Sequence, residues 1–104
     1  MTDWADIARQ AAETAPARGQ DWGFTFVHEH PVFYDCQPLP EARRAGLHDA
    51  IAALFAGRGI RELARAEHGG VVSIVFDGTH DDVDALRGEI TEVLYAVSCA
   101  TGDA

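Results

Sequence analysis

The stretch Val71-Val72-Ser73-Ile74-Val75-Phe76 is the most continuous apolar run in the chain and is rich in β-branched residues. Such a run predicts a central β-strand that is covered on at least one face. Gly69 and Gly70 separate it from the preceding segment, Ile60 to Glu67. That segment contains good helix formers, but the glycines on both sides of it favour a second strand.

Downstream of this pair, Thr79-His80-Asp81-Asp82 is a variant of the capping box, with acidic residues at the positive end of a helix dipole. Apolar residues then recur at helical spacing, at Val83, Leu86, Ile90, Val93, Leu94 and Val97. The pattern predicts a long amphipathic helix with one buried stripe.

Upstream, Glu41 to Gly57 predicts another amphipathic helix, with its apolar stripe at Leu47, Ala50, Ile51, Leu54 and Phe55. Before it, Trp22 to His30 alternates with period two, and Val32 to Cys36 forms a second short strand after Pro31. We therefore expect a hairpin turn between His28 and Pro31, with His28 and His30 on the same face as Trp22, Phe24 and Phe26. A first helix begins at Trp4 and ends near Pro16 and Gly19.

The order of elements is therefore α-β-β-α-β-β-α over a single domain, residues 1–104. We predict an α+β fold of two layers, in which a four-stranded, mainly antiparallel sheet carries the helices on one face. Trp22, Phe24 and Phe26 share a face of this sheet, and helices must cover that face or leave it for a partner.

The charge is strongly unbalanced, with seventeen acidic and eight basic residues and a net charge of −9. Such a surface repels a phosphate backbone, so we expect no direct nucleic-acid binding. All basic residues are arginines and lysine is absent, which indicates a GC-rich bacterial genome. The first 17 residues lack the features of a signal peptide, and no apolar run is long enough for a membrane span. We expect a cytoplasmic protein with reduced cysteines.

The common catalytic signatures are absent, which argues against an enzyme. Potential metal ligands gather at His28, His30, Asp35 and Cys36, and His80 and Asp81 join them if the loops meet. Cys36 and one of these histidines could instead form a thiolate–imidazole pair. We favour partly exposed histidines at a strand end and structural thiols at Cys36 and Cys99, and assign no metal ligand, catalytic residue or cofactor.

The C-terminal segment, residues 77–104, holds seven acidic residues and one arginine. On the outer side of its helix we expect a face for partner binding, formed by Asp81, Asp84, Glu89, Glu92 and Tyr95. Gly88 lies between these residues, and a close approach by a partner would explain a glycine in the interior of a helix.

In size and charge the chain resembles the acidic inhibitors and immunity proteins that neutralise basic nucleases, and the anti-CRISPR proteins that occupy nucleic-acid channels. That resemblance implies a small acidic module that blocks a basic, nucleic-acid-binding protein. Two alternatives stay open. One is a small metal-binding protein or enzyme that uses His28, His30, Cys36 and His80, and the other is a structural or assembly subunit that forms a homodimer.

Overall fold

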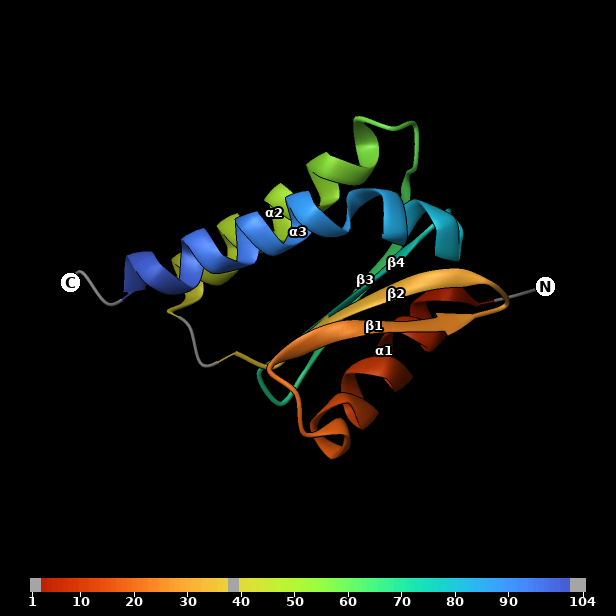
Figure 1. The fold of residues 1–104 in the computed structure, drawn as a ribbon. Coiled ribbons are helices and arrows are strands. Elements are labelled where there is room, and N and C mark those ends of the chain that lie inside the picture. Colours follow the sequence, from red (N-terminus) through yellow and green to blue (C-terminus); the bar gives the residue numbers. More distant parts are fainter. Residues whose placement is uncertain (1–2, 38–39, 102–104) are drawn as a thin grey trace.

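The computed structural model describes residues 3–37 and 40–101, and the side chains of the last helix as far as Ala96 (Figure 1). The predicted order of helices and strands is confirmed. The elements are α1 (Trp4–Thr14), a 3₁₀ helix η1 (Ala15–Arg18), β1 (Trp22–Val27), β2 (His30–Asp35), α2 (Glu41–Ala56), β3 (Glu62–His68), β4 (Val71–Phe76) and α3 (His80–Thr101).

The four strands form one sheet in the order β1-β2-β4-β3, and every neighbouring pair is antiparallel. Strand β4 is central and buried along its whole length, as its apolar run predicts. The segment before it is a strand, β3, in spite of its helix-forming residues. Pairing with β4 gives β3 a ladder of hydrogen bonds, and this tertiary contact outweighs the local helix propensity.

Helices cover both faces of the sheet, which differs from the two layers expected (Figure 1). Phe33, Ile74 and Phe76 pack against α2 and α3, whereas Val32 and Val75 pack against α1. Because β2 and β4 are apolar on both faces, one layer of helices leaves half of their apolar side chains exposed. Helix α1 supplies the missing cover and makes the fold three layers deep.

Helix α1 can lie close to the sheet because its fully buried residues have small side chains. Ala8, Ala11 and Ala12 are its buried residues, and the Ser73 hydroxyl of β4 donates a hydrogen bond to the carbonyl of Ala8. The helix begins after Asp3, whose carboxylate accepts the backbone N–H of Asp6 at 3.2 Å. This N-cap satisfies one of the helix's unpaired donors.

The β1–β2 turn is shorter than expected and contains only His28 and Glu29. Both residues have positive φ, 51° and 72°, which is the pattern of a type I′ turn. Pro31 lies inside β2 opposite Phe26. The prediction that His28 and His30 share one strand face is therefore wrong, since His28 belongs to the turn and His30 begins the next strand.

Helix α3 begins as its capping motif predicts, with the Asp82 carboxylate accepting the Thr79 backbone N–H at 2.8 Å. Its apolar stripe is buried at Val83, Leu86, Ile90 and Leu94. Val97, the last residue of the predicted stripe, lies outside the described side chains, as does Cys99. Among the described residues, no helix combines the length and apolar character that crossing a bilayer requires.

Candidate functional site

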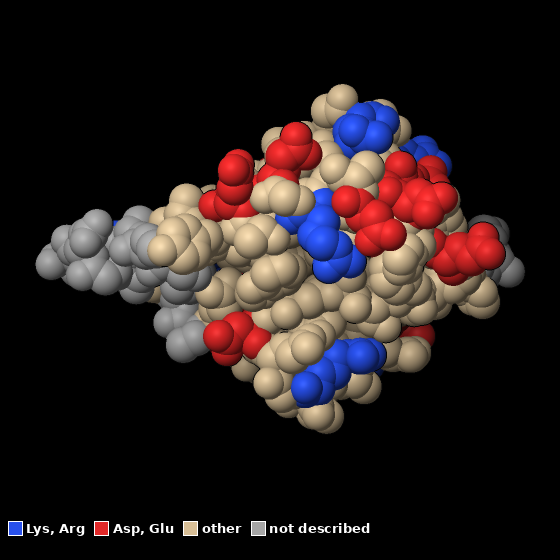
Figure 2. Space-filling view, viewed as in Figure 1, with Lys and Arg blue, Asp and Glu red and all other residues tan. Residues whose placement is uncertain are grey.

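The outer face of α3 places all five residues expected to bind a partner in solvent. We call these residues the acidic face: Asp81, Asp84, Glu89, Glu92 and Tyr95. Figure 2 shows acidic side chains gathered over α3, with arginine between them. Tyr95 is 70% exposed, which is unusual for a large aromatic side chain and typical of residues that a partner covers.

The carboxylates of the acidic face differ in how far they are neutralised. Asp84 lies 3.2 Å from His80 Nδ1 and 3.1 Å from Arg87 Nη2. Within the described part of the chain, Glu89 and Glu92 form no ion pair. Their charges are therefore available to a cationic partner without the loss of an internal contact.

A groove runs beside the acidic face, between α3 and strand β1. We call it the β1 groove, and it has a volume of ≈ 560 Å³. It is lined by Gln20, Asp21, Trp22, Gly23, Phe24, Phe26, Val83 and Arg87. Figure 2 shows uncharged surface next to the charged side chains of α3. Phe26 is 37% exposed, so the groove offers apolar contact area beside negative charge.

Gly23 is required in this wall by the ring of Tyr34, its neighbour across the β1–β2 pair. A Cβ atom at Gly23 would lie 2.5 Å from the Tyr34 hydroxyl oxygen. That hydroxyl donates a hydrogen bond of 2.7 Å to Gln20 Oε1. The glycine therefore allows an aromatic side chain to cross over β1 and fix the start of the strand.

The four residues of the metal or enzyme alternative do not come together. The rings of His28 and His30 lie against Trp4, with centroids 6.5 and 4.9 Å away. His30 Nδ1 also lies 3.0 Å from the carbonyl oxygen of Gly78. His80 instead packs on Phe26 at 4.8 Å.

Cys36 follows the far end of β2 and its backbone N–H bonds to Asp21. Six residues of extended chain separate it from His30, which is about 20 Å at 3.3 Å per residue. Burial raises the pKa of the Cys36 thiol, and the carboxylates of Asp35 and Asp21 raise it further. A thiolate–imidazole pair is thus not formed, and the neutral thiol is favoured.

One group of potential metal ligands does converge among the described side chains: His80, Asp81 and Asp84 lie on the first turns of α3, with ligand atoms within 4.8 Å of one another. All three are exposed. His80 and Asp84 already face each other as a possible ion pair. Asp81 and Asp84 belong to the acidic face, and an exposed acidic group of this kind is common without a metal ion.

A buried polar pair lies elsewhere, beneath α2. His48 Nε2 is 2.8 Å from Asp35 Oδ2, and the two residues are 3% and 0% exposed. Asp35 Oδ1 accepts two further hydrogen bonds from Gln37, through its backbone N–H and its side-chain amide. Asp35 was expected among the potential metal ligands, and this expectation is wrong. Both oxygens of its buried carboxylate are hydrogen-bonded to His48 or Gln37.

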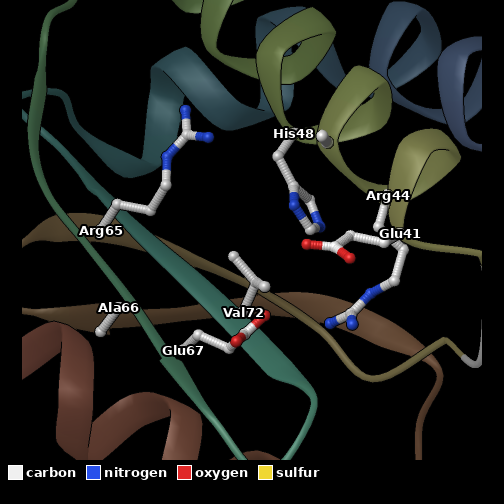
Figure 3. A pocket seen from close by; sticks show the side chains of 8 residues that line it. Glu41, Arg44, His48, Arg65, Ala66, Glu67 and Val72 are labelled. Atoms are coloured by element: carbon white, nitrogen blue, oxygen red, sulfur yellow. The ribbon is translucent and has the colours of Figure 1, made fainter.

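His48 lines a pocket between α2 and the strands β3 and β4, seen from close by in Figure 3. Arg44 and Glu41 of α2 and Arg65 and Glu67 of β3 border the same space. An imidazole held by a carboxylate can act as a general base if a nucleophile or substrate lies next to it. None of the residues described as lining this pocket carries a hydroxyl or thiol, so the pair has no protein nucleophile there.

Sequence reasoning missed His48, although one signal for it was present. His48 lies on the buried side of α2, three and seven residues before Ile51 and Phe55, which are both fully buried. A titratable residue on an apolar stripe needs a buried partner. Asp35, thirteen residues earlier and on the sheet face toward α2, is that partner.

No protein-family model, no curated protein and no solved structure matches this chain.

Proposed function

We propose that this chain is a protein-binding module that docks a basic partner on the acidic face of α3. The observation that carries the proposal is the exposure of all five of its residues on one side of a single helix, with Glu89 and Glu92 in no ion pair among the described residues. The rest of the helix is fixed by its buried stripe, so these side chains are presented on a rigid element.

The partner class follows from charge. A chain of net charge −9 attracts cationic proteins over a distance of about 8 Å at physiological salt, the Debye length. Carboxylates on a rigid helix can stand where a nucleic-acid-binding protein expects phosphates. A basic nucleic-acid-binding protein is therefore the favoured partner, and blocking its nucleic-acid surface is the consequence of docking.

The competing proposals receive less support from the geometry. A metal or thiol enzyme that uses His28, His30, Cys36 and His80 requires groups that the structure places on different parts of the fold. A homodimeric assembly subunit would bring two strongly acidic surfaces together, and this repulsion opposes association.

The proposal is tested by affinity capture from the source cell with matched charge-reversal variants. Glu89→Lys with Glu92→Lys removes two carboxylates of the acidic face, and Glu13→Lys with Glu67→Lys makes the same change of net charge on α1 and β3. We expect the acidic-face variant to lose a basic protein that the wild type and the control retain at low salt. Recovery of the same proteins by both variants would contradict a role for this face.

A further inference from the structure

Strand β1 lies at the end of the sheet and, in the part of the chain that the structure describes, pairs with β2 alone, so its other edge is free. The register tells which of its backbone groups face outward. Cys36 N–H donates to the Asp21 carbonyl at 2.7 Å, and hydrogen-bonded pairs alternate along an antiparallel ladder. Gly23, Thr25 and Val27 therefore bond to β2. The N–H and C=O groups of the alternate residues, Trp22, Phe24 and Phe26, point away from the sheet.

Pro31 agrees with this assignment, since it lies opposite Phe26. A proline has no N–H and fits only where the ladder needs no donor. The outward groups of Phe26 are thus not used inside the sheet. Three successive outward positions on β1 amount to six backbone donors and acceptors, enough to template another strand.

The two edges of the sheet differ in their protection. Soluble proteins blunt edge strands with charges, prolines and bulges. Strand β3 has such features, with Glu62, Arg65 and Glu67 along it and an irregular register between Glu62 and Ala64. Strand β1, Trp-Gly-Phe-Thr-Phe-Val, contains no charge and no proline. An unprotected edge in a chain that protects its other edge indicates that the β1 edge is reserved for binding.

The side chains of the same three residues line the β1 groove. A strand that paired with β1 would direct alternate side chains over Trp22, Phe24 and Phe26 toward Val83 of α3. Backbone groups at the edge and an apolar groove beside it are thus aligned along the same residues. This is the arrangement by which an exposed sheet edge accepts an extended peptide.

We propose that β1 accepts an added antiparallel strand from the partner, and that this strand is apolar at alternate positions and basic at its two ends. The inference rests on the proposed function, since it assigns the segment by which the basic partner docks. The added strand would extend the sheet to five strands and lie beside the acidic face of α3.

The basic ends follow from the charges at the two ends of the groove. Asp21 borders the groove where β1 begins. The carboxylates of Glu29 and Asp81 border Phe26 where β1 ends, beside the ring of His80. A second copy of this chain is the poorer occupant. If two β1 strands paired antiparallel about Phe24, Asp21 of each copy would lie toward the hairpin turn of the other copy, which contains Glu29. These carboxylates would repel each other.

A synthetic peptide, acetylated and amidated Arg-Val-Thr-Val-Thr-Val-Arg, is the probe. In antiparallel addition its valines lie opposite Trp22, Phe24 and Phe26, and the valine N–H groups bond to β1. We expect the amides of these three residues to exchange with solvent at least tenfold more slowly at saturating peptide, measured by NMR. The amides of Thr25 and of β3 should change less than about twofold.

Two N-methylated peptides separate backbone pairing from side-chain contact. Methylation of the valine nitrogens removes the donors that face β1, whereas methylation of the threonine nitrogens leaves them in place. We expect the first peptide to bind at least tenfold more weakly than the parent and the second to bind within about threefold of it. Equal binding of all three peptides overturns strand addition.

A matched pair of variants tests the edge from the side of the protein. Phe26→Pro removes both the ring and one outward N–H, and Phe26→Ala removes the ring alone. The proline should weaken peptide binding at least threefold beyond the alanine. The N-methylated peptides keep the test valid if Phe26→Pro does not fold, since they leave the protein unchanged.

The outcomes distinguish this inference from the proposed function. Binding of the arginine-ended peptide without protection of the edge amides overturns strand addition and leaves the acidic binding surface intact. If a peptide with glutamate at both ends binds as tightly as the arginine-ended peptide and also protects the edge amides, strand addition stands and the proposal that the partner is basic is overturned. Concentration-dependent protection of the edge without peptide, together with a dimer in analytical ultracentrifugation, assigns the edge to a second copy and overturns the proposal.

Discussion

Two adjacent residues in the left-handed region set the tip of the β1–β2 hairpin. His28 and Glu29 have φ values of 51° and 72°, and the left-handed conformation costs an ordinary residue about 1–2 kcal/mol. A type I′ turn normally places Asn and Gly at these positions. The chain tolerates the strain because the ladder from Trp22 to Asp35 and the contact of Trp4 with His30 fix the two strands around the turn.

This strain predicts that Glu29→Gly stabilises the protein, by about 0.5–1 kcal/mol, since glycine adopts positive φ without a steric penalty. The measurement is the free energy of unfolding from urea titration. Glu29→Ala is the control, because it removes the same carboxylate and keeps the strained conformation. A gain in stability from alanine equal to that from glycine would attribute the effect to charge and contradict the strain.

The buried contact between Asp35 and His48 is the second residue-scale feature with a measurable effect. Removing one member of a buried hydrogen-bonded pair leaves the other without its partner, which typically costs about 1–3 kcal/mol. We expect Asp35→Ala to fall in this range in chemical denaturation. Asp35→Asn should cost less, since its amide oxygen can still accept from Gln37 at the Oδ1 position and its NH2 group can donate to His48 Nε2 in the other imidazole tautomer. Wild-type stability of Asp35→Ala would show that the pair carries no stabilising contact.

At the scale of elements, helix α3 buries an apolar stripe on one side and carries a destabilising glycine, Gly88, on its outer side. Gly88 lies in its interior, and apart from the backbone of its own helix and its chain neighbours no described atom lies within 4 Å of the place of a Cβ atom there. The same holds for Gly46 of α2. Glycine in the interior of a helix costs about 1 kcal/mol relative to alanine. No close contact among the described residues requires either glycine, and close approach by the proposed partner would explain Gly88.

Gly88→Ala and Gly46→Ala should each stabilise the protein by about 1 kcal/mol, measured as a rise in the urea midpoint at constant m-value. The two substitutions should differ in partner binding. Gly88 lies among the residues of the acidic face, so a Cβ atom there would hinder a closely docked partner, whereas Gly46 lies on another helix. Unchanged capture of the partner by Gly88→Ala would remove the argument for close approach at this position.

The elements differ in how much of them the sequence could predict. Strand β4 and helix α3 follow from local patterns, because a run of buried β-branched residues and a capped apolar stripe depend little on the rest of the chain. The second layer of helices could not be predicted from the sequence, since the apolar periodicity of α1 does not indicate which face of the sheet the helix covers. The Asp35–His48 contact joins two elements and depends on their packing. The unprotected β1 edge became visible only with the strand order.

At the scale of the whole molecule, the arginines do not form an open basic surface. They are concentrated in the segment from Arg43 to Arg65, and several of them are engaged within the protein. Arg61 pairs with Asp77, Arg65 with Glu62 and Asp49, and Arg44 donates to the carbonyl of Gly70. The chain holds seventeen acidic residues against eight arginines. A ligand that approaches the molecule therefore meets a net negative charge.

We therefore expect no binding of duplex DNA or RNA at physiological salt. Non-specific binding draws its free energy from cations that displace counterions from the phosphates, and this chain presents few unpaired ones. In a fluorescence-polarisation titration with a random-sequence duplex, polarisation should stay constant up to about 100 µM protein, the weak end of ordinary non-specific affinity. Salt-sensitive binding at micromolar concentrations, abolished by Arg43→Glu with Arg58→Glu, would contradict this expectation. It would also move the functional surface from the acidic face of α3 to the arginines around α2 and overturn the choice of a basic partner.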